Sequence, residues 1–324
     1  MAVAASGGRD STALLHCAAQ AAHHLGVGVH ALHVQHGLHP DAEKWADHLR
    51  QQTQHWAAAG GLPVQFHLHR ITEQPASGDS IEAWARARRY AALADMARKA
   101  ECSMILLAHH RSDQAETVML QALRGAGTAG MAAMPRFAVR DGLSWARPWL
   151  DKPRDLIDAY VQHHDLEYVD DPSNSDPRFA RNRLRQAVWP AFEAAFPDAE
   201  AALVAVAHQA QDSLACLQEI AQLDLALVAD ATGLRIAAWL SLSEARRLNA
   251  LRAWLVEALP GGVTRNLLHR LMKELPTGRG AVWQTATPAG QGMLRLHRGV
   301  LQFQAASSTV ISPLVAARRK SRPG

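Results

Sequence analysis

Residues 6–12 read Ser-Gly-Gly-Arg-Asp-Ser-Thr and connect a short apolar stretch to a segment with the composition of a helix. The adjacent Gly7 and Gly8 let the backbone pass close to a ligand. The helix start behind them offers unpaired N–H groups and the positive end of the helix dipole. Because a phosphate group binds well at such a place, the sequence predicts a strand, a glycine turn and a helix around a phosphate.

The polar residues of this loop narrow the choice of ligand. The hydroxyls of Ser6 and Ser11 can donate to phosphate oxygens. A carboxylate beside a polyphosphate is expected mainly where a cation such as Mg²⁺ lies between them, so Asp10 is the predicted metal ligand. The G-x-x-x-x-G-K-[ST] loop is excluded because no lysine follows the glycines, and G-x-G-x-x-G is excluded because the two glycines are adjacent.

Helices and strands alternate after the loop. Helical periodicity is found at residues 11–25, 41–59, 80–99 and 112–123, and strand patterns at 27–34, 64–68 and 104–108. This order predicts an α/β fold with a parallel sheet, helices on both faces and ligands at the carboxyl ends of the strands.

The alternation stops near Trp189 and Pro190, where we predict a domain boundary. We expect a catalytic domain over residues 1–188, a smaller and mainly helical domain over 189–306, and a flexible basic tail over 307–324. The predicted elements of the second domain are helices at 199–228, 243–259 and 264–275, and a small hairpin at 293–303.

Composition excludes some classes of protein. The net charge of +4 and the pI of about 9.2 are mildly basic and do not by themselves indicate nucleic acid. The three cysteines form no C-x-x-C pair, which argues against a zinc or iron–sulfur site and suits a reducing cytoplasm. Since there is no targeting segment and no apolar run of ~20 residues, we expect a cytoplasmic protein without a membrane segment.

A second polar segment, residues 110–117, directly follows the predicted strand at 104–108. If helical, it places His110, Asp113 and Glu116 on one face. Asp113 and Glu116 also suit a helix start that needs only capping. The position at the carboxyl end of a strand favours a functional role, because the phosphate loop is expected at the same edge.

Three further segments are candidates for a functional role, but a purely structural role would also explain each of them. Glu82 and Arg86 lie i,i+4 on the helix at 80–99, which a surface salt bridge would explain. Arg124 precedes Gly125 and belongs either to a helix C-cap or to a phosphate-binding loop. The acids, amides and arginines between residues 170 and 185 are also typical of a solvated loop.

Taken in order, these segments resemble the motifs of the tRNA(Ile)-lysidine synthases, a family of the N-type ATP pyrophosphatase or PP-loop superfamily. The matching motifs are S-G-G-R-D-S, H-V-Q-H-G-L at 33–38, I-E-A-W-A-R-A-R-R-Y at 81–90, H-R-S-D-Q-A-E-T, R-G-A-G-T-A-G-M, and D-D-P-S-N with the following R-N-R-L-R. The resemblance is close over residues 2–185 and looser beyond. It implies a Rossmann-like PP-loop fold.

The resemblance also implies a reaction. ATP adenylates C2 of the wobble cytidine in an isoleucine tRNA with a CAU anticodon, and L-lysine then displaces AMP. The implied partners are that tRNA and L-lysine, the implied cofactors are ATP and Mg²⁺, and a homodimer is compatible with the sequence.

Residue roles carried over on the matching motifs fall into three groups. The ATP-binding residues are Ser6, Gly7, Gly8, Arg9, Asp10 and Ser11, with Asp10 as the metal ligand. The catalytic residues are Asp10, Asp113, Glu116 and Arg86. The candidates for substrate or RNA are His36, Arg89, His110, Arg124, Arg181, Asn182 and Arg185.

Basic residues of the second domain are candidates for the tRNA backbone, with a solvated helix face as the alternative. They are Arg246, Arg247, Arg252, Arg265 and Arg270. Only five residues precede Ser6, fewer than is usual in the family, so we expect a short first strand. Longer members carry a further C-terminal domain, which this length does not include.

Three other functions fit parts of the sequence. A tRNA thiolase of the same superfamily is disfavoured by the lack of C-x-x-C pairs. A small-molecule amidating ligase would leave the RNA-related motifs as coincidence. An RNA-binding protein with a dead nucleotide site is disfavoured by the intact Asp10 and serines.

Overall fold

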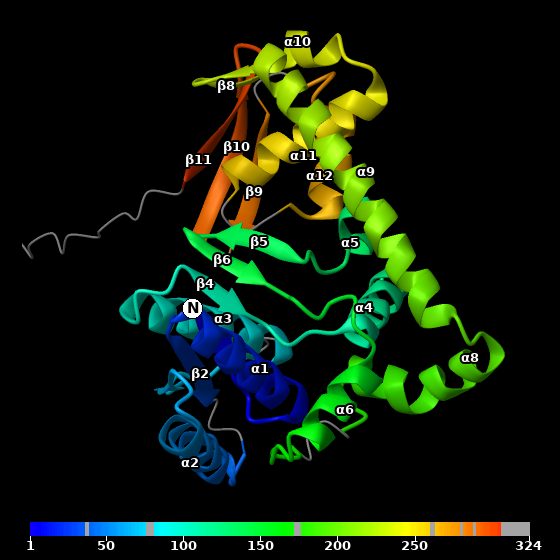
Figure 1. Cartoon of the computed structure of the whole chain (residues 1–324). Coiled ribbons are helices and arrows are strands. Elements are labelled where there is room, and N and C mark those ends of the chain that lie inside the picture. Colours follow the sequence, from blue (N-terminus) through cyan, green and yellow to red (C-terminus); the bar gives the residue numbers. More distant parts are fainter. Residues whose placement is uncertain are drawn as a thin grey trace, which may run out of the picture. The chain divides into compact units, whose positions relative to one another are not determined.

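The computed structural model describes residues 1–35, 39–75, 81–171, 176–259, 263–278, 281–287 and 290–305. The chain divides into two compact units, Met1–Ser213 and Leu214–Gly324. Helix α9 (Ala199–Val228) begins in the first unit and ends in the second (Figure 1). The division therefore falls later than the boundary at 188/189 that the end of the alternation suggested.

The first unit contains a six-stranded sheet of order β3-β2-β1-β4-β6-β5. All neighbouring strands are parallel except β5 and β6. The strands are β1 (Ala2–Ala4), β2 (Val29–Gln35), β3 (Val64–Arg70), β4 (Met104–Leu106), β5 (Phe137–Arg140) and β6 (Leu143–Ala146). This sheet confirms the predicted α/β fold class, and the first strand is short, as expected.

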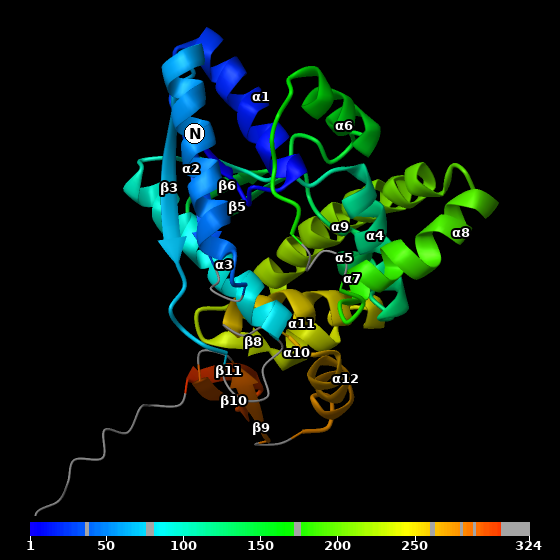
Figure 2. The same ribbon diagram turned by 90° about the horizontal axis from the view of Figure 1, so that it is seen from below.

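Helices flank both faces of this sheet (Figure 2). Leu14, Leu15 and Leu49 of α1 and α2 pack on one face, and Leu93 of α3 packs against Ile105 on the other. The helices are α1 (Arg9–Leu25), α2 (Ala42–Gly60), α3 (Ile81–Lys99), α4 (Arg111–Leu123), α5 (Thr128–Met131), α6 (Arg154–His163), α7 (Ala180–Arg183) and α8 (Trp189–Ala195), with a π-helical turn η2 (Leu184–Val188) between the last two.

The second unit combines helices with a second, antiparallel sheet of order β7-β8-β11-β10-β9. Trp239, Leu251, Leu271 and Trp283 are fully buried in its core. Its other elements are α10 (Ile236–Leu240), α11 (Glu244–Ala258), α12 (Arg265–Glu274), β7 (Ala229–Asp230), β8 (Gly233–Arg235), β9 (Val282–Thr287), β10 (Gly290–His297) and β11 (Val300–Ala305).

The sequence predicted the three longer helices and one hairpin of this unit, but neither the short α10 nor the rest of its sheet. The hairpin is confirmed as β10–β11, which turns at Arg298 and Gly299 with positive φ at both. Strands β7 and β8 have two and three residues, too few for an alternating pattern to be visible. None of the helices in the described ranges is long and apolar enough to cross a membrane.

Because each unit has its own core, we expect core mutations to act locally. Leu15→Ala should weaken the first unit and Leu251→Ala the second, each by about 2–5 kcal/mol, since both side chains are fully buried. Leu227→Ala, at a side chain that is 63% exposed, should change the unfolding free energy by no more than ~0.5 kcal/mol. Hydrogen exchange resolved by peptide measures this. Equal loss of protection in both units from either core variant would contradict separate cores.

Candidate active site

The two polar segments singled out in the sequence follow two neighbouring parallel strands. The phosphate loop follows β1, and the segment that begins α4 follows β4. The chain runs from β1 outward to β2 and β3 on one side, and returns to β4 on the other side of β1. In a parallel sheet, this change of direction opens a crevice at the carboxyl ends of the two strands, where ligands bind.

Hydrogen bonds within residues 6–11 fix the shape of the phosphate loop. The Ser11 hydroxyl accepts from the Ser6 backbone N–H at 3.1 Å, lies 2.9 Å from the Ser6 hydroxyl, and is 2.9 Å from the Gly8 carbonyl. Gly7 has a φ of +88°, which favours glycine, and its carbonyl accepts from Val169 at 2.9 Å. Ser11 is buried and Ser6 exposed. The loop is therefore held in shape by its own hydrogen bonds.

His33, the first residue of the H-V-Q-H-G-L motif, supports the loop from β2. Its Nδ1 donates to the Ala5 carbonyl at 2.8 Å, one residue before Ser6, and its side chain is buried. Burial lowers the pKa of His33, so the ring is neutral near pH 7. Sequence reasoning placed its candidate instead at His36, which lies outside the described residues.

Asp10 lies in the first turn of α1 and faces the start of α4. Its carboxylate is 3.1 Å from Arg9 Nε and 3.7 Å from His110 Nε2. Burial raises the pKa of Asp10, but the His110 and Arg9 contacts outweigh burial and lower it to about 2. Arg9 also contacts Asp158 of α6 at 2.6 Å. Arg9 is thus held by two carboxylates, and its phosphate contact stays a prediction.

His110 is the N-cap residue of α4, and Asp113 lies one turn into the helix. The Asp113 carboxylate accepts from the His110 backbone N–H at 3.1 Å and lies 3.5 Å from His110 Nε2. Burial lowers the pKa of His110, but Asp10 and Asp113 outweigh burial and raise it. One imidazole therefore joins the two carboxylates that sequence reasoning proposed separately. The capping interpretation is confirmed, because Asp113 accepts from the backbone N–H at the helix start, and the functional role stays a prediction.

Two arginines from the segment after residue 176 neutralise the acids of α4. Arg185 is 2.8 Å from Asp113 Oδ1 and 2.5 Å from Glu116 Oε1. Arg181 lies 3.5 Å from Glu116 and donates to the Thr117 hydroxyl at 2.8 Å. Burial raises the pKa of Glu116, and the pairing with Arg185 offsets part of this increase. The pKa of Asp113 is lowered despite burial, because His110, His109 and the two arginines are close to its carboxylate. The pKa values of the two neighbouring acids are therefore shifted in opposite directions.

The structure adds His109 and Arg147, which sequence reasoning missed. Burial, Arg147, Arg181 and Arg86 hold the pKa of His109 at about 3 although Asp113 raises it, and its Nδ1 is buried without a protein partner. Arg147 follows β6 at the same edge, is 3% exposed, and donates to the Pro135 carbonyl at 2.8 Å. The signal for His109 was its position directly after a predicted strand. No strand was predicted before Arg147.

The other predicted site residues lie less centrally. Arg86 is exposed on α3, over the Tyr90 ring at 5.2 Å, and is close enough to lower the pKa of His109. Arg89 is exposed on the same helix. Asn182 is buried and donates to the Asp176 carbonyl at 2.9 Å. Arg124 is the C-cap residue of α4, at the opposite end from Asp113. No contact joins Arg124 to the other described site residues.

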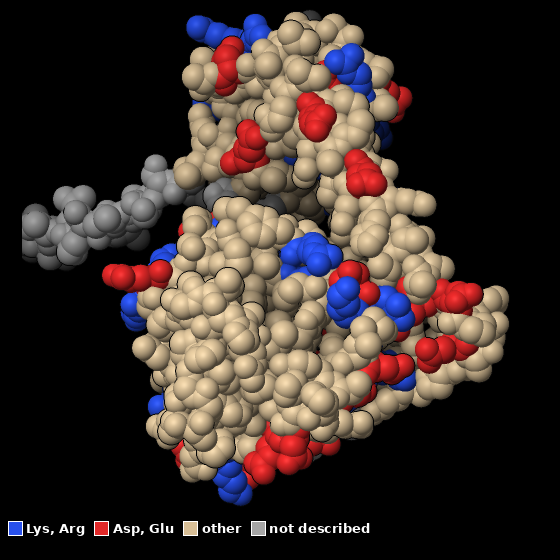
Figure 3. Space-filling model, viewed as in Figure 1, with Lys and Arg blue, Asp and Glu red and all other residues tan. Residues whose placement is uncertain are grey.

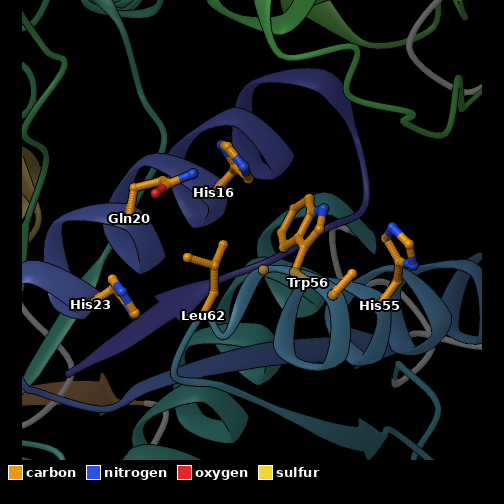
Figure 4. A pocket seen from close by; sticks show the side chains of 8 residues that line it. His16, Gln20, His23, His55, Trp56 and Leu62 are labelled. Carbon is orange, nitrogen blue, oxygen red and sulfur yellow. The ribbon is translucent and has the colours of Figure 1, made fainter.

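A cavity of about 390 Å³ lies elsewhere, between α1 and α2 (Figure 4). Its lining includes His16 and His23 of α1 and His55 and Trp56 of α2, without a carboxylate. None of its lining residues belongs to the predicted site. In the described part of the chain, no group of three or more His, Cys, Asp or Glu side chains is arranged to hold a metal ion. The carboxyl edge of β1 and β4, where the contacts of Asp10, His110 and Asp113 meet, is the candidate active site.

The raised pKa of His110 predicts a pH-dependent stability. A histidine with a folded pKa above 6.5 stabilises the protein fully below pH 6.5, and loses this contribution as the pH rises through the folded pKa. His110→Gln in metal-free buffer should therefore lower the unfolding free energy most at acidic pH, and less as the pH rises. Urea unfolding over a pH series measures this, with the exposed His24→Gln as the control. A loss that grows with pH would contradict it.

Known proteins resemble both parts of this chain. A family model described as a PP-loop domain matches residues 1–192, and one described as a TilS substrate binding domain matches residues 234–302. The solved U34-tRNA thiolase NcsA from Methanococcus maripaludis shares the fold, with a TM-score of 0.53 at 14% identity over 64% of this chain and 70% of that one.

Two curated relatives are more similar in sequence, and both are named tRNA(Ile)-lysidine synthase. The Ralstonia nicotianae protein is 40% identical over 97% of this chain and 66% of its own length. The Bordetella pertussis protein is 42% identical over 85% of this chain and 86% of its own length. The chain therefore belongs to the tRNA(Ile)-lysidine synthase family of PP-loop proteins.

Proposed function

We propose that this protein is an ATP-dependent ligase that converts the wobble cytidine of a CAU-anticodon isoleucine tRNA to lysidine. The observation that carries the proposal is the position of His110, 3.7 Å from Asp10 of the phosphate loop and 3.5 Å from Asp113 of α4. The phosphate loop with Asp10, which suits the phosphates of ATP, therefore lies next to Asp113, whose carboxylate suits an amine.

The proposed reaction has two steps. The C2 oxygen of cytosine is a poor leaving group, so it first attacks the α-phosphorus of ATP, and the bond to pyrophosphate breaks. The ε-amine of lysine then attacks C2, the C2–oxygen bond breaks, and AMP departs with that oxygen. The proton lost by the amine must pass to a base, and the negative charge on pyrophosphate and AMP must be stabilised.

The residues of the crevice have properties that suit these steps. The backbone N–H groups at the start of α1 face the place where phosphates bind. His110 and the two arginines lower the pKa of Asp113, so its carboxylate can accept a hydrogen bond from the lysine amine. His109 is neutral and its Nδ1 is unpaired, so it is available to a base or sugar of the substrate.

Asp10 fits the Mg²⁺ that ATP normally carries. Its pKa of about 2 keeps it ionised, and 32% of its side chain is exposed. Mg²⁺ beside a nucleotide needs only one or two protein carboxylates, because phosphates and water supply the rest. When bound, the ion neutralises phosphate charge.

In the second unit, two of the five candidate arginines are suited to the tRNA backbone. Arg246 is paired with the buried Asp224, Arg270 with Glu274, and Arg247 lies over Trp239. Arg252 and Arg265 are exposed, and among the described residues no carboxylate lies within ion-pair distance of either. Basic and acidic side chains are interspersed on the face seen in Figure 3, so that face shows no single large basic patch.

Other parts of the proposal concern partners and alternatives. We propose a cytoplasmic location, and a homodimer remains a prediction. A thiolase is less suitable because all three cysteines are free thiols at distant sequence positions. An amidating ligase for a small molecule and an inactive RNA-binding protein give different results in the assay below.

The central test is formation of AMP and base-linked lysine from ATP, labelled L-lysine and CAU-anticodon tRNA. Asp10→Asn should slow both at least ~100-fold, because it removes the acidic side chain in the first turn of α1 that we propose as the Mg²⁺ ligand. Asp212→Asn, at an exposed position of α9, is the matched control. Lysine incorporation unchanged in Asp10→Asn would contradict its role. AMP formation without tRNA would favour the small-molecule ligase. If no AMP forms at all, the inactive RNA-binding protein is favoured.

The tRNA contact has a separate test. If Arg252 and Arg265 bind phosphates, replacing both with glutamine should weaken tRNA binding and reduce the slope of log affinity against log salt by about 1 to 2. Filter binding over a salt series measures the slope. Arg270→Gln should have a smaller effect because Glu274 already pairs with that arginine. A slope that stays the same in the double variant would exclude these two phosphate contacts.

A further inference from the structure

Glu200 connects the start of α9 to the start of α4. Its Oε1 accepts from Arg111 Nε at 2.5 Å, and its Oε2 accepts from the Ser112 hydroxyl at 3.0 Å. The Glu200 side chain is 15% exposed and that of Arg111 34%. Both carboxylate oxygens are thus used, and the ion pair is largely shielded from water, unlike an ordinary surface pair.

The two residues that Glu200 holds are those between His110 and Asp113. Arg111 is also bound on the other side, because its backbone N–H donates to the Lys152 carbonyl at 3.0 Å. The four residues 110–113 are therefore fixed by Lys152 through the backbone and by Glu200 through two side chains. Neither contact is needed to begin the helix, since Asp113 already bonds the His110 N–H.

A second contact holds the first part of α9 in place. Gln211 Nε2 donates to the carbonyls of Ala132 at 2.8 Å and Met134 at 3.1 Å. Gln114 of α4 bonds both the N–H and the carbonyl of the same Met134. Helix α9 is thus attached at two turns to the same part of the first unit. The position of Glu200 relative to α4 is therefore fixed by contacts other than its own.

We propose that Glu200 is a positioning residue for the reaction. Its carboxylate sets the first turn of α4 so that His110 and Asp113 face Asp10. The expected effect on kcat rests on the proposed function. The expected effect on the first turn of α4 rests on the geometry alone. It requires a carboxylate, because a glutamine side chain has one oxygen and cannot accept from both Arg111 and Ser112 in this way.

The test compares Glu200→Gln with Glu193→Gln, an exposed glutamate of α8. Glu200→Gln should lower kcat for lysidine formation about 10-fold, because displacing reacting groups by ~1 Å costs up to ~100-fold. The KM for ATP and the melting temperature should stay close to those of the wild type. Ser112→Ala should lower kcat less than Glu200→Gln does. In the background of Glu200→Gln, Ser112→Ala should lower kcat by a smaller factor than it does in the wild type.

A measurement without substrate separates this proposal from the proposed function. Amide exchange over residues 110–116 should rise in Glu200→Gln and not in Glu193→Gln, while the β1–β4 core stays protected. If the wild type forms no lysidine while exchange still behaves this way, the result contradicts the proposed function but supports the role of Glu200 in fixing the first turn of α4. Unchanged exchange and an unchanged kcat in Glu200→Gln, or a uniform loss of stability, would overturn the positioning role.

Discussion

The buried carboxylates of α4 are the constraint on which the site depends. Asp113 and Glu116 are 8% and 3% exposed, and a buried charge is costly unless it is paired. Arg185 supplies the pairing with contacts of 2.5 to 2.9 Å to both acids. Because Arg185 is 69 residues from Glu116 in sequence, the segment after residue 176 has to fold back over α4 for the site to form. The chemistry of the site and the path of the chain are set by the same contact.

That path includes a local departure from the α-helix. Arg185 lies in the π-helical turn Leu184–Val188, between α7 and α8. Pro190 follows, which has no N–H and whose ring clashes with the carbonyl four residues before it, so an ordinary α-helix is disfavoured here. Single π-helical turns are frequent at functional sites. The wider turn changes the direction in which successive side chains leave the helix, and here Arg185 reaches both acids.

The sequence predicted the elements of the first unit well where strands are buried and helices are long. Its misses have physical reasons. Strands β5 and β6 have four residues each, so Arg147 at the end of β6 gave no signal. Asp113, Glu116 and Arg185 were each named, but no local pattern indicates that residues so far apart form one ion-pair group. Glu200 resembled only an acidic residue in the first turn of a helix.

Pairing also explains why the site suits anions although it contains three acids. Arg9 and His110 face Asp10, and Arg181 and Arg185 face the acids of α4, so each negative charge has a positive neighbour. Among the side chains that the structure describes, no carboxylate lies within ion-pair distance of the buried Arg147. Burial lowers the pKa of Arg147, but the guanidinium stays charged because arginine is by far the most basic side chain. At the carboxyl edge of β1 and β4, the charge of Arg147 is therefore not offset by a described carboxylate, and this suits the polyphosphate that we propose as the ligand there.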